Sequence, residues 1–347
     1  MEFGLFLEFP AQDEATDQEA FTQGFNLVDE AERMGVDSVW LAEYHFSPFS
    51  VLSAPIMVAT VIAGRTKRVR IGFGVLLLPL SNPVRMAEEI ATLDHISQGR
   101  VDFGIGRGTF PDHHDAFNSP YPESRGRFKE YLDIILKAWT EEQFSYEGEH
   151  YQCHDLRIRP KPFQNPHPPI RVGITSAETF PIIGQMGYPI FINPSRVFSL
   201  AELAPHIKEY RKAWHEAGHE GDGEVGLRIP VYVADTADRA YNEPKESALA
   251  SIHNLGQRVA GSASRAGTTG NWRAQSEQIL SMSYDDWLRD KVVYGTPEAV
   301  TDRLQQLIAE LHLSQIIYEV NFGRQIPREL QMSSLRLFND RVLPHVK

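Results

Sequence analysis

A chain of 347 residues is long enough for one large α/β barrel or for two ordinary domains, and length alone does not choose between them. Its 42% hydrophobic and 23% charged residues are typical of a globular protein with a substantial core. The net charge of −12 argues against a nucleic-acid or anionic-membrane partner, and the single cysteine, Cys153, excludes an internal disulfide and a multi-cysteine zinc site.

The amino-terminal stretch "MEFGLFLEFP" carries acidic residues and no basic segment, so we expect no signal peptide. The longest strongly apolar run, residues 75–80, is too short to span a bilayer. The sequence therefore predicts a cytoplasmic protein.

Short apolar strands alternate with helices along the chain. The expected strands cover residues 3–7, 37–43, 68–78, 100–106, 170–174, 188–192, 226–234 and 315–320. The expected helices cover residues 17–34, a short stretch from 55, 83 to about 98, 124–140, a stretch to 186, 201–217, a long stretch from 236, 295–311, and 327 to about 341. Gly35 suits the end of the first helix, because glycine adopts positive φ without strain.

Eight strands, each followed by a helix, predict a (β/α)8 TIM barrel as a single domain over residues 1–347, with a doubly wound sheet as the alternative. Residues 141–169 interrupt the alternation with aromatic and turn residues, and we expect a β-ribbon insertion there. Residues 261–275 are rich in small and polar residues, and we expect a mobile lid over 261–290.

Barrel enzymes place their chemistry at the carboxyl ends of the strands. Glu43, Tyr44 and His45 follow the second expected strand, within "LAEYHFSPFS". Glycines follow the third and fourth, where the backbone can approach a flat ligand. Arginine, hydroxyl groups and a helix start favour a phosphate site, and together these features indicate a planar, monophosphorylated cofactor. The residues concerned are Gly74, Val75, Gly106, Arg107, Thr175, Ser176, Ala177 and Thr179.

Other motifs give weaker evidence about function. "GIGRG" resembles the start of a dinucleotide-binding fingerprint, but Thr109 stands at the third glycine position. The segments "PDHHD" (111–115) and "EHYQCHD" (149–155) contain metal-ligand residue types without a metal-binding pattern. A lone arginine or histidine is more often a surface or structural residue than a functional one.

The chain resembles the bacterial luciferase-like, flavin-dependent monooxygenases over nearly its whole length. The resemblance rests on "MGVDSVWLAEYHFSPFS", "NPVRMAEEIATLDHISQGRVDFGIGRG", "ITSAET" and "YGTPEAV". It implies the barrel fold and reduced FMN as cofactor. It places Arg107, Ser176 and Thr179 at the FMN phosphate, with Thr175 where luciferase has a glutamate, and it implies a non-prolyl cis peptide at Gly74–Val75 beneath the ring.

Two positions depart from the luciferase catalytic subunit. Tyr44 stands where that subunit has its proposed general-base histidine, and only the second histidine, His45, remains. A tyrosine with an ordinary pKa of about 10 donates hydrogen bonds at neutral pH and is not a base. Gly106 stands where luciferase has a reactive cysteine. Both changes count against efficient light emission and leave oxygenation open.

The resemblance implies an FMN-dependent monooxygenase that uses O2, through a flavin hydroperoxide, on a small organic substrate such as an aldehyde or ketone. His45, Tyr44 and Glu43 are the expected proton-handling residues. Members of this family usually receive reduced FMN from a separate NAD(P)H:flavin reductase and form homodimers, so the resemblance implies both here. The alternatives are a deazaflavin-dependent hydride-transfer enzyme, a non-catalytic flavin-binding partner subunit, and a metal-dependent barrel hydrolase.

Overall fold

Eight parallel strands close into a barrel in the computed structural model, which describes residues 1–11, 16–194, 198–263 and 269–347. Their order is β10, β12, β1, β2, β3, β5, β8, β9, and β9 pairs with β10 to complete the closure. The strands are β1 (Glu2–Leu7), β2 (Ser38–Leu41), β3 (Arg70–Phe73), β5 (Val101–Gly106), β8 (Ile170–Ile174), β9 (Ile190–Ile192), β10 (Val225–Val233) and β12 (Gln315–Glu319). The predicted (β/α)8 barrel is confirmed over the doubly wound sheet, because a doubly wound sheet does not close.

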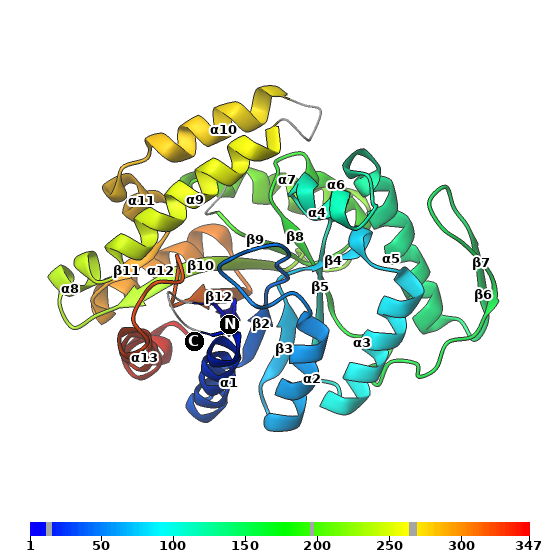
Figure 1. Cartoon of the computed structure of the whole chain (residues 1–347), viewed down its shortest axis with the longest axis horizontal. Coiled ribbons are helices and arrows are strands. Elements are labelled where there is room, and N and C mark those ends of the chain that lie inside the picture. Colours follow the sequence, from blue (N-terminus) through cyan, green and yellow to red (C-terminus); the bar gives the residue numbers. More distant parts are fainter. Residues whose placement is uncertain (12–15, 195–197, 264–268) are drawn as a thin grey trace.

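Helices surround the strands, and α9 and α10 lie side by side across one side of the barrel (Figure 1). No helix in the described parts of the chain is both long and apolar enough to span a bilayer. The α-helices are α1 (Asp17–Met34), α2 (Pro55–Arg65), α3 (Pro83–Ser97), α4 (Pro111–Ala116), α5 (Ser124–Thr140), α6 (Thr179–Met186), α7 (Leu203–Glu216), α8 (Ala237–Asn242), α9 (Lys245–Ala263), α10 (Thr269–Ser281), α11 (Tyr284–Asp290), α12 (Pro297–Leu311), α13 (Arg328–Leu337) and α14 (Leu343–Val346).

Local signals set the helix ends where the sequence placed them. At the start of α1, the Thr16 side chain accepts the N–H of Glu19, and the Glu19 carboxylate accepts the N–H of Thr16. Gly35 ends the same helix with φ of 80°, a left-handed conformation that favours glycine. The resulting turn returns the chain directly to the barrel at β2.

A tryptophan packs between the strands of the barrel. Trp40 on β2 is fully buried, and its indole N–H donates to Ser38 Oγ at 2.8 Å. A Cβ atom placed on Gly4 or Gly72 would lie within 2.6 Å of the indole. Glycine on the neighbouring strands therefore makes room for Trp40.

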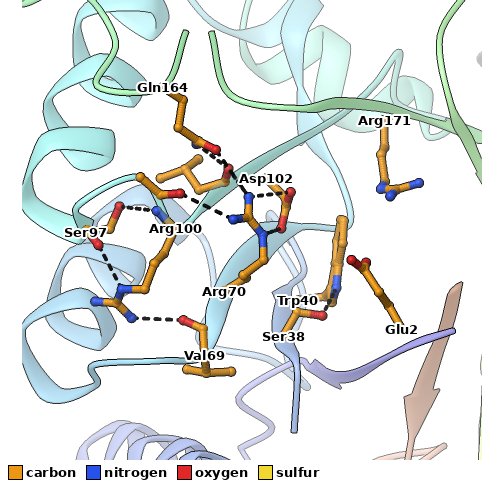
Figure 2. Close-up of polar contacts among 12 residues, drawn as sticks. Glu2, Ser38, Trp40, Val69, Arg70, Ser97, Arg100, Asp102, Gln164 and Arg171 are labelled. Carbon is orange, nitrogen blue, oxygen red and sulfur yellow. Dashed lines mark hydrogen bonds and ion pairs between the residues drawn. The ribbon is translucent and has the colours of Figure 1, made fainter. Parts of the chain in front are cut away.

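The amino-terminal end of the barrel is held by a partly buried polar network (Figure 2). The guanidinium of Arg70 donates to both carboxylate oxygens of Asp102 at 2.8 and 2.9 Å. Arg100 donates to the carbonyls of Ser97 and Val69 at 2.8 and 2.9 Å. These contacts tie β3 and β5 to α3 on the face opposite the strand ends that carry chemistry, so we assign them to stability.

The structure differs from the sequence prediction in several elements. The third expected strand breaks at a cis peptide between Gly74 and Val75 into β3 and the short β4 (Leu76–Leu77). The long helix expected from 236 is two helices, α8 and α9, and β11 (Val293–Gly295) adds to the edge of β10. The expected lid region contains part of α9 together with α10 and α11, while its residues 264–268 lie outside the described chain.

The β-ribbon expected within 141–169 is present. It consists of the antiparallel pair β6 (Phe144–Glu147) and β7 (Gln152–Leu156). Figure 1 shows it on the outside of the molecule, beside α5.

Candidate active site

A cavity of about 380 Å³ opens at the carboxyl ends of β2, β3, β5 and β8. Most of the residues predicted for the site line it: Glu43, Tyr44, Gly74, Val75, Gly106, Arg107, Thr175, Ser176 and Thr179. The other two, His45 and Ala177, directly follow lining residues in the chain. The structure therefore brings residues from four separate strand ends to one hollow.

Val75 forms the floor of this cavity. A Cβ atom at Gly106 would lie 2.7 Å from one methyl carbon of Val75, and a Cβ at Gly173 would lie 2.7 Å from the other. The peptide bond that precedes Val75 is cis, as predicted. The Val75 side chain thus fits between two glycines, which leaves an apolar surface against which a flat ring can lie.

One side of the cavity carries hydroxyl groups and cations. Ser176 and Thr179, at the start of α6, have their hydroxyl oxygens 2.8 Å apart. Arg107 follows β5, donates to Ser124 Oγ at 3.0 Å, and lies over the ring of Tyr121. Hydroxyl groups, a helix start and an arginine are the groups that hold a phosphate.

Two further cations that the sequence analysis missed line the same cavity. Arg125 and Lys129 stand four residues apart on α5, so they share one face of that helix. Arg125 also donates to Glu178 at 2.8 Å. In the sequence, their spacing of four residues could have indicated a shared helix face. Nothing in the sequence indicated that this face of α5 turns toward Ser176.

Glu43 connects the backbone to His45. One carboxylate oxygen accepts the N–H of Leu77 at 2.9 Å, and the other lies 2.8 Å from His45 Nε2. The two side chains are only 8% and 12% exposed. Glu43 therefore orients the His45 ring through one of its two nitrogens.

Tyr44 points its hydroxyl away from this pair. The phenol donates to Glu8 Oε1 at 2.6 Å, and Glu8 also pairs with Arg324 at 2.8 Å. Burial alone raises the pKa of Glu8, but the charges of Arg324 and Arg228 lower it below its ordinary value. Burial and the Glu8 charge raise the pKa of Tyr44, so the phenol stays protonated and acts as a donor.

A second carboxylate completes this buried cluster. Glu319, at the end of β12, accepts from Arg228 at 2.9 Å. Burial and the neighbouring Glu8 charge raise the pKa of Glu319. Two carboxylates and two guanidinium groups thus balance one another in the centre of the barrel mouth.

His113 is a lining residue whose importance the sequence analysis missed. It lies on α4, is 3% exposed, and its ring stands edge-on to the His45 ring at 5.6 Å. Arg258 on α9 lies 2.6 Å from His113 Nε2. Burial and the Arg258 charge lower the pKa of His113 to about 4, so the ring is neutral and its Nε2 accepts the bond.

The histidine-containing segments form other contacts. His114 lies 3.1 Å from the carbonyl of Ser119, and His154 pairs with Glu147 at 3.1 Å. Side chains that ligate metals do not gather in groups of three or more anywhere in the described residues.

A closed parallel barrel whose mouth holds a cavity lined by hydroxyl groups, cations and a fixed carboxylate has the architecture of a barrel enzyme. The sequence profile of the luciferase-like monooxygenases matches residues 1–315 of this chain. The protein therefore belongs to the luciferase-like monooxygenase family, a family of oxidoreductases.

Relatives by sequence agree with this assignment. An uncharacterized Sinorhizobium fredii protein, y4vJ, is 26% identical, and the match covers 93% of this chain and 91% of that protein. The alkanal monooxygenase alpha chain of Photorhabdus laumondii is 29% identical over 63% of this chain and 61% of its own length. The oxygenase component of a flavin-dependent trigonelline monooxygenase from Acinetobacter baylyi is 27% identical over 69% of this chain and 67% of that protein.

Solved structures share the whole fold. The monooxygenase RslO1 from Streptomyces bottropensis has a TM-score of 0.83 and 25% identity, with all of both chains covered. The oxygenating constituent of a Pseudomonas putida 3,6-diketocamphane monooxygenase, in complex with FMN, has a TM-score of 0.82 and 21% identity over 100% and 99% of the two chains. An F420-dependent secondary alcohol dehydrogenase has a TM-score of 0.77 and 16% identity with the same coverage. The fold therefore occurs with both cofactors.

Proposed function

We infer that this protein is the oxygenase of a flavin-dependent monooxygenase, using reduced FMN and O2 to oxygenate a small organic substrate, an aldehyde or ketone. One observation carries the proposal. A single cavity joins Arg107, Ser176 and Thr179, at the ends of β5 and β8, to Glu43 after β2, whose carboxylate lies 2.8 Å from His45 Nε2, and Val75 also lines it.

The lining residues fit FMN in chemistry and position. Ser176, Thr179 and Arg107 supply donors for one phosphate, and Arg125 and Lys129 add positive charge near it. Val75, flanked by Gly106 and Gly173, offers an apolar surface for the ring. The cavity volume of about 380 Å³ lies within the range of small-molecule sites, ~300–1,000 Å³.

The chain's own side chains then have separate tasks. Reduced FMN, when bound, supplies the electrons that activate O2. Glu43 orients His45, which takes or gives a proton at the substrate. Phe110, Phe128 and Ile182 line the cavity with apolar surface and exclude water. In this structure the Tyr44 hydroxyl acts on Glu8, so its contribution to substrate binding comes through its ring.

Two partners belong to the proposal. A relative described as an oxygenase component supports a separate NAD(P)H:flavin reductase as the source of reduced FMN. A homodimer through α2 is supported by the composition of that helix, "PIMVATVIAGR", which is apolar on nearly every face and leaves Met57 73% exposed and Val61 45% exposed.

Rapid mixing of the protein and reduced FMN with oxygenated buffer tests the reaction class without knowledge of the substrate. We expect the absorbance of oxidised flavin to return more slowly than with free reduced FMN, because a site that excludes water would slow the formation of oxidised flavin. Equal rates, together with anaerobic reduction of F420 by a secondary alcohol, would identify a deazaflavin enzyme instead. Tight FMN binding with unchanged oxidation would identify a non-catalytic flavin-binding subunit.

A further inference from the structure

A second chamber adjoins the proposed flavin cavity. It has a volume of about 510 Å³ and lies between the barrel mouth and α9. Four residues line both hollows: Tyr44, Phe110, Asn193 and Arg228. A molecule in the second chamber therefore lies against the same side chains as a molecule in the first.

The chamber contains one cation whose charge is poorly balanced. Arg228 and Arg324 each have a carboxylate within 2.9 Å, Glu319 and Glu8 respectively. The nearest polar partner of Arg258 is instead the neutral ring of His113 at 2.6 Å, and Asp112, the one carboxylate among the described residues that forms an ion pair with it, is 3.7 Å away.

Position and exposure make Arg258 suitable for binding a ligand. Its guanidinium lies 3.8 Å above the ring of Phe110, one of the residues shared by the two hollows. The side chain retains 29% exposure, so a group in the chamber can reach it. A guanidinium forms paired, charge-assisted hydrogen bonds with a planar oxyanion.

Part of the remaining chamber surface is apolar, beside polar lining residues that include Glu8 and Glu319, each of which is paired with an arginine. Phe46, Phe49, Phe322 and Leu255 contribute hydrocarbon surface, and Phe46 is 65% exposed although it is a large aromatic residue. A ligand that fits such walls has an apolar body and an anionic end.

We propose that the second chamber binds the substrate as an organic anion, with a carboxylate or chemically similar oxyanion on Arg258 and an apolar body against Phe46 and Phe322. This statement about the substrate rests on the proposed function. It narrows the expected substrates to carbonyl compounds that also carry an anionic group. Arg258 then determines specificity, and Asp112 opposes binding through like charge.

Benzoate, benzamide and benzylamine provide a test, because they share one ring and differ in charge. Calorimetric titration of flavin-free and FMN-loaded protein should show benzoate binding about tenfold or more tightly than benzamide, with benzylamine weakest. Arg258→Gln should reduce the affinity for benzoate to that for benzamide, and Arg258→Lys should retain part of the preference. Asp112→Asn should tighten benzoate binding.

Arg273→Gln is the matched control. It removes the same charge from an arginine on α10 that is 83% exposed and does not line the chamber, so it should leave all three affinities unchanged. Equal binding of the three probes to the unaltered protein, or a benzoate preference that survives in Arg258→Gln, would overturn the proposal. Since flavin-free protein is also titrated, failure of FMN to bind would count against the proposed function and leave the anion preference separately measurable.

Discussion

The Tyr44 hydroxyl donates a 2.6 Å hydrogen bond to Glu8, although the two residues lie 36 positions apart and follow different strands. The bond links the loop after β2 to the end of β1. It also directs the Tyr44 hydroxyl toward the buried charge cluster of Glu8, Arg324, Arg228 and Glu319.

Tyr44→Phe should lower the free energy of unfolding by about 1–2 kcal/mol, because Glu8 loses a buried donor while keeping Arg324. Urea denaturation at neutral pH measures the loss. A small loss of stability accompanied by a large fall in turnover would show that the hydroxyl serves the substrate rather than Glu8.

Gly106→Ala should destabilise the protein by about 1–3 kcal/mol, since the new methyl group would lie 2.7 Å from Val75. Adding Val75→Ala should recover part of that loss, so the double variant is more stable than the sum of the single changes predicts. Gly64→Ala on α2 is the control, because a Cβ there meets nothing within 4 Å. If the stability losses of Gly106→Ala and Val75→Ala simply add in the double variant, the contact described between these two residues is wrong.

The stability of the protein should fall as the pH is lowered from about 6.5 to about 4. The pKa of His113 is lowered to about 4 in the folded protein by burial and by Arg258, while the unfolded chain binds a proton near the ordinary value of ~6.5. The unfolded state thus holds more protons between these values, and stability is greatest above them, with a contribution of up to roughly 3 kcal/mol.

His113→Gln should flatten this part of the stability–pH profile, measured by thermal denaturation across the same range. Asp112, His45 and His114 also influence His113, so some pH dependence will remain. An unchanged slope in the variant would show that His113 binds protons equally in the folded and unfolded states, against the lowered pKa described above.

Arg107→Ala and His45→Ala should have opposite effects on binding and catalysis. We expect Arg107→Ala to weaken FMN about tenfold to a hundredfold and to leave riboflavin, which has no phosphate, unaffected. His45→Ala should slow product formation by about a hundredfold or more with little change in FMN affinity. Fluorescence titration measures the FMN affinity and steady-state assays measure turnover. Arg85→Ala, at an exposed position on α3, is the control. If both variants lose only stability, the site assignment is wrong.

Met57→Asp should convert a homodimer to monomers, because it places a charge on the exposed apolar face of α2. Sedimentation velocity reports the mass, and Leu280→Asp, at an exposed apolar position on α10, is the control. A monomeric unaltered protein, or a variant that remains dimeric, would remove α2 as the interface.

Local sequence signals determined most elements of the barrel. The capping residues Thr16 and Glu19 and the terminal Gly35 act within one turn of their helix, so the pattern alone fixes α1. The apolar strand segments and the residues at their carboxyl ends were also readable, because a closed parallel barrel brings those ends together. The cis peptide at Gly74–Val75 followed from the family resemblance.

Only the tertiary structure decided which side chains meet. Arg258 contacts His113 across 145 positions, and Tyr44 contacts Glu8 rather than a ligand. Arg125 and Lys129 face the cavity only because of how α5 is rotated against the barrel. Such pairings depend on the packing of whole elements, and burial then sets the charge state of each group. No periodicity or short motif encodes which side chains pair or how deeply each is buried. The hydrogen-bond partners and protonation states of the site residues are therefore set only by the folded barrel.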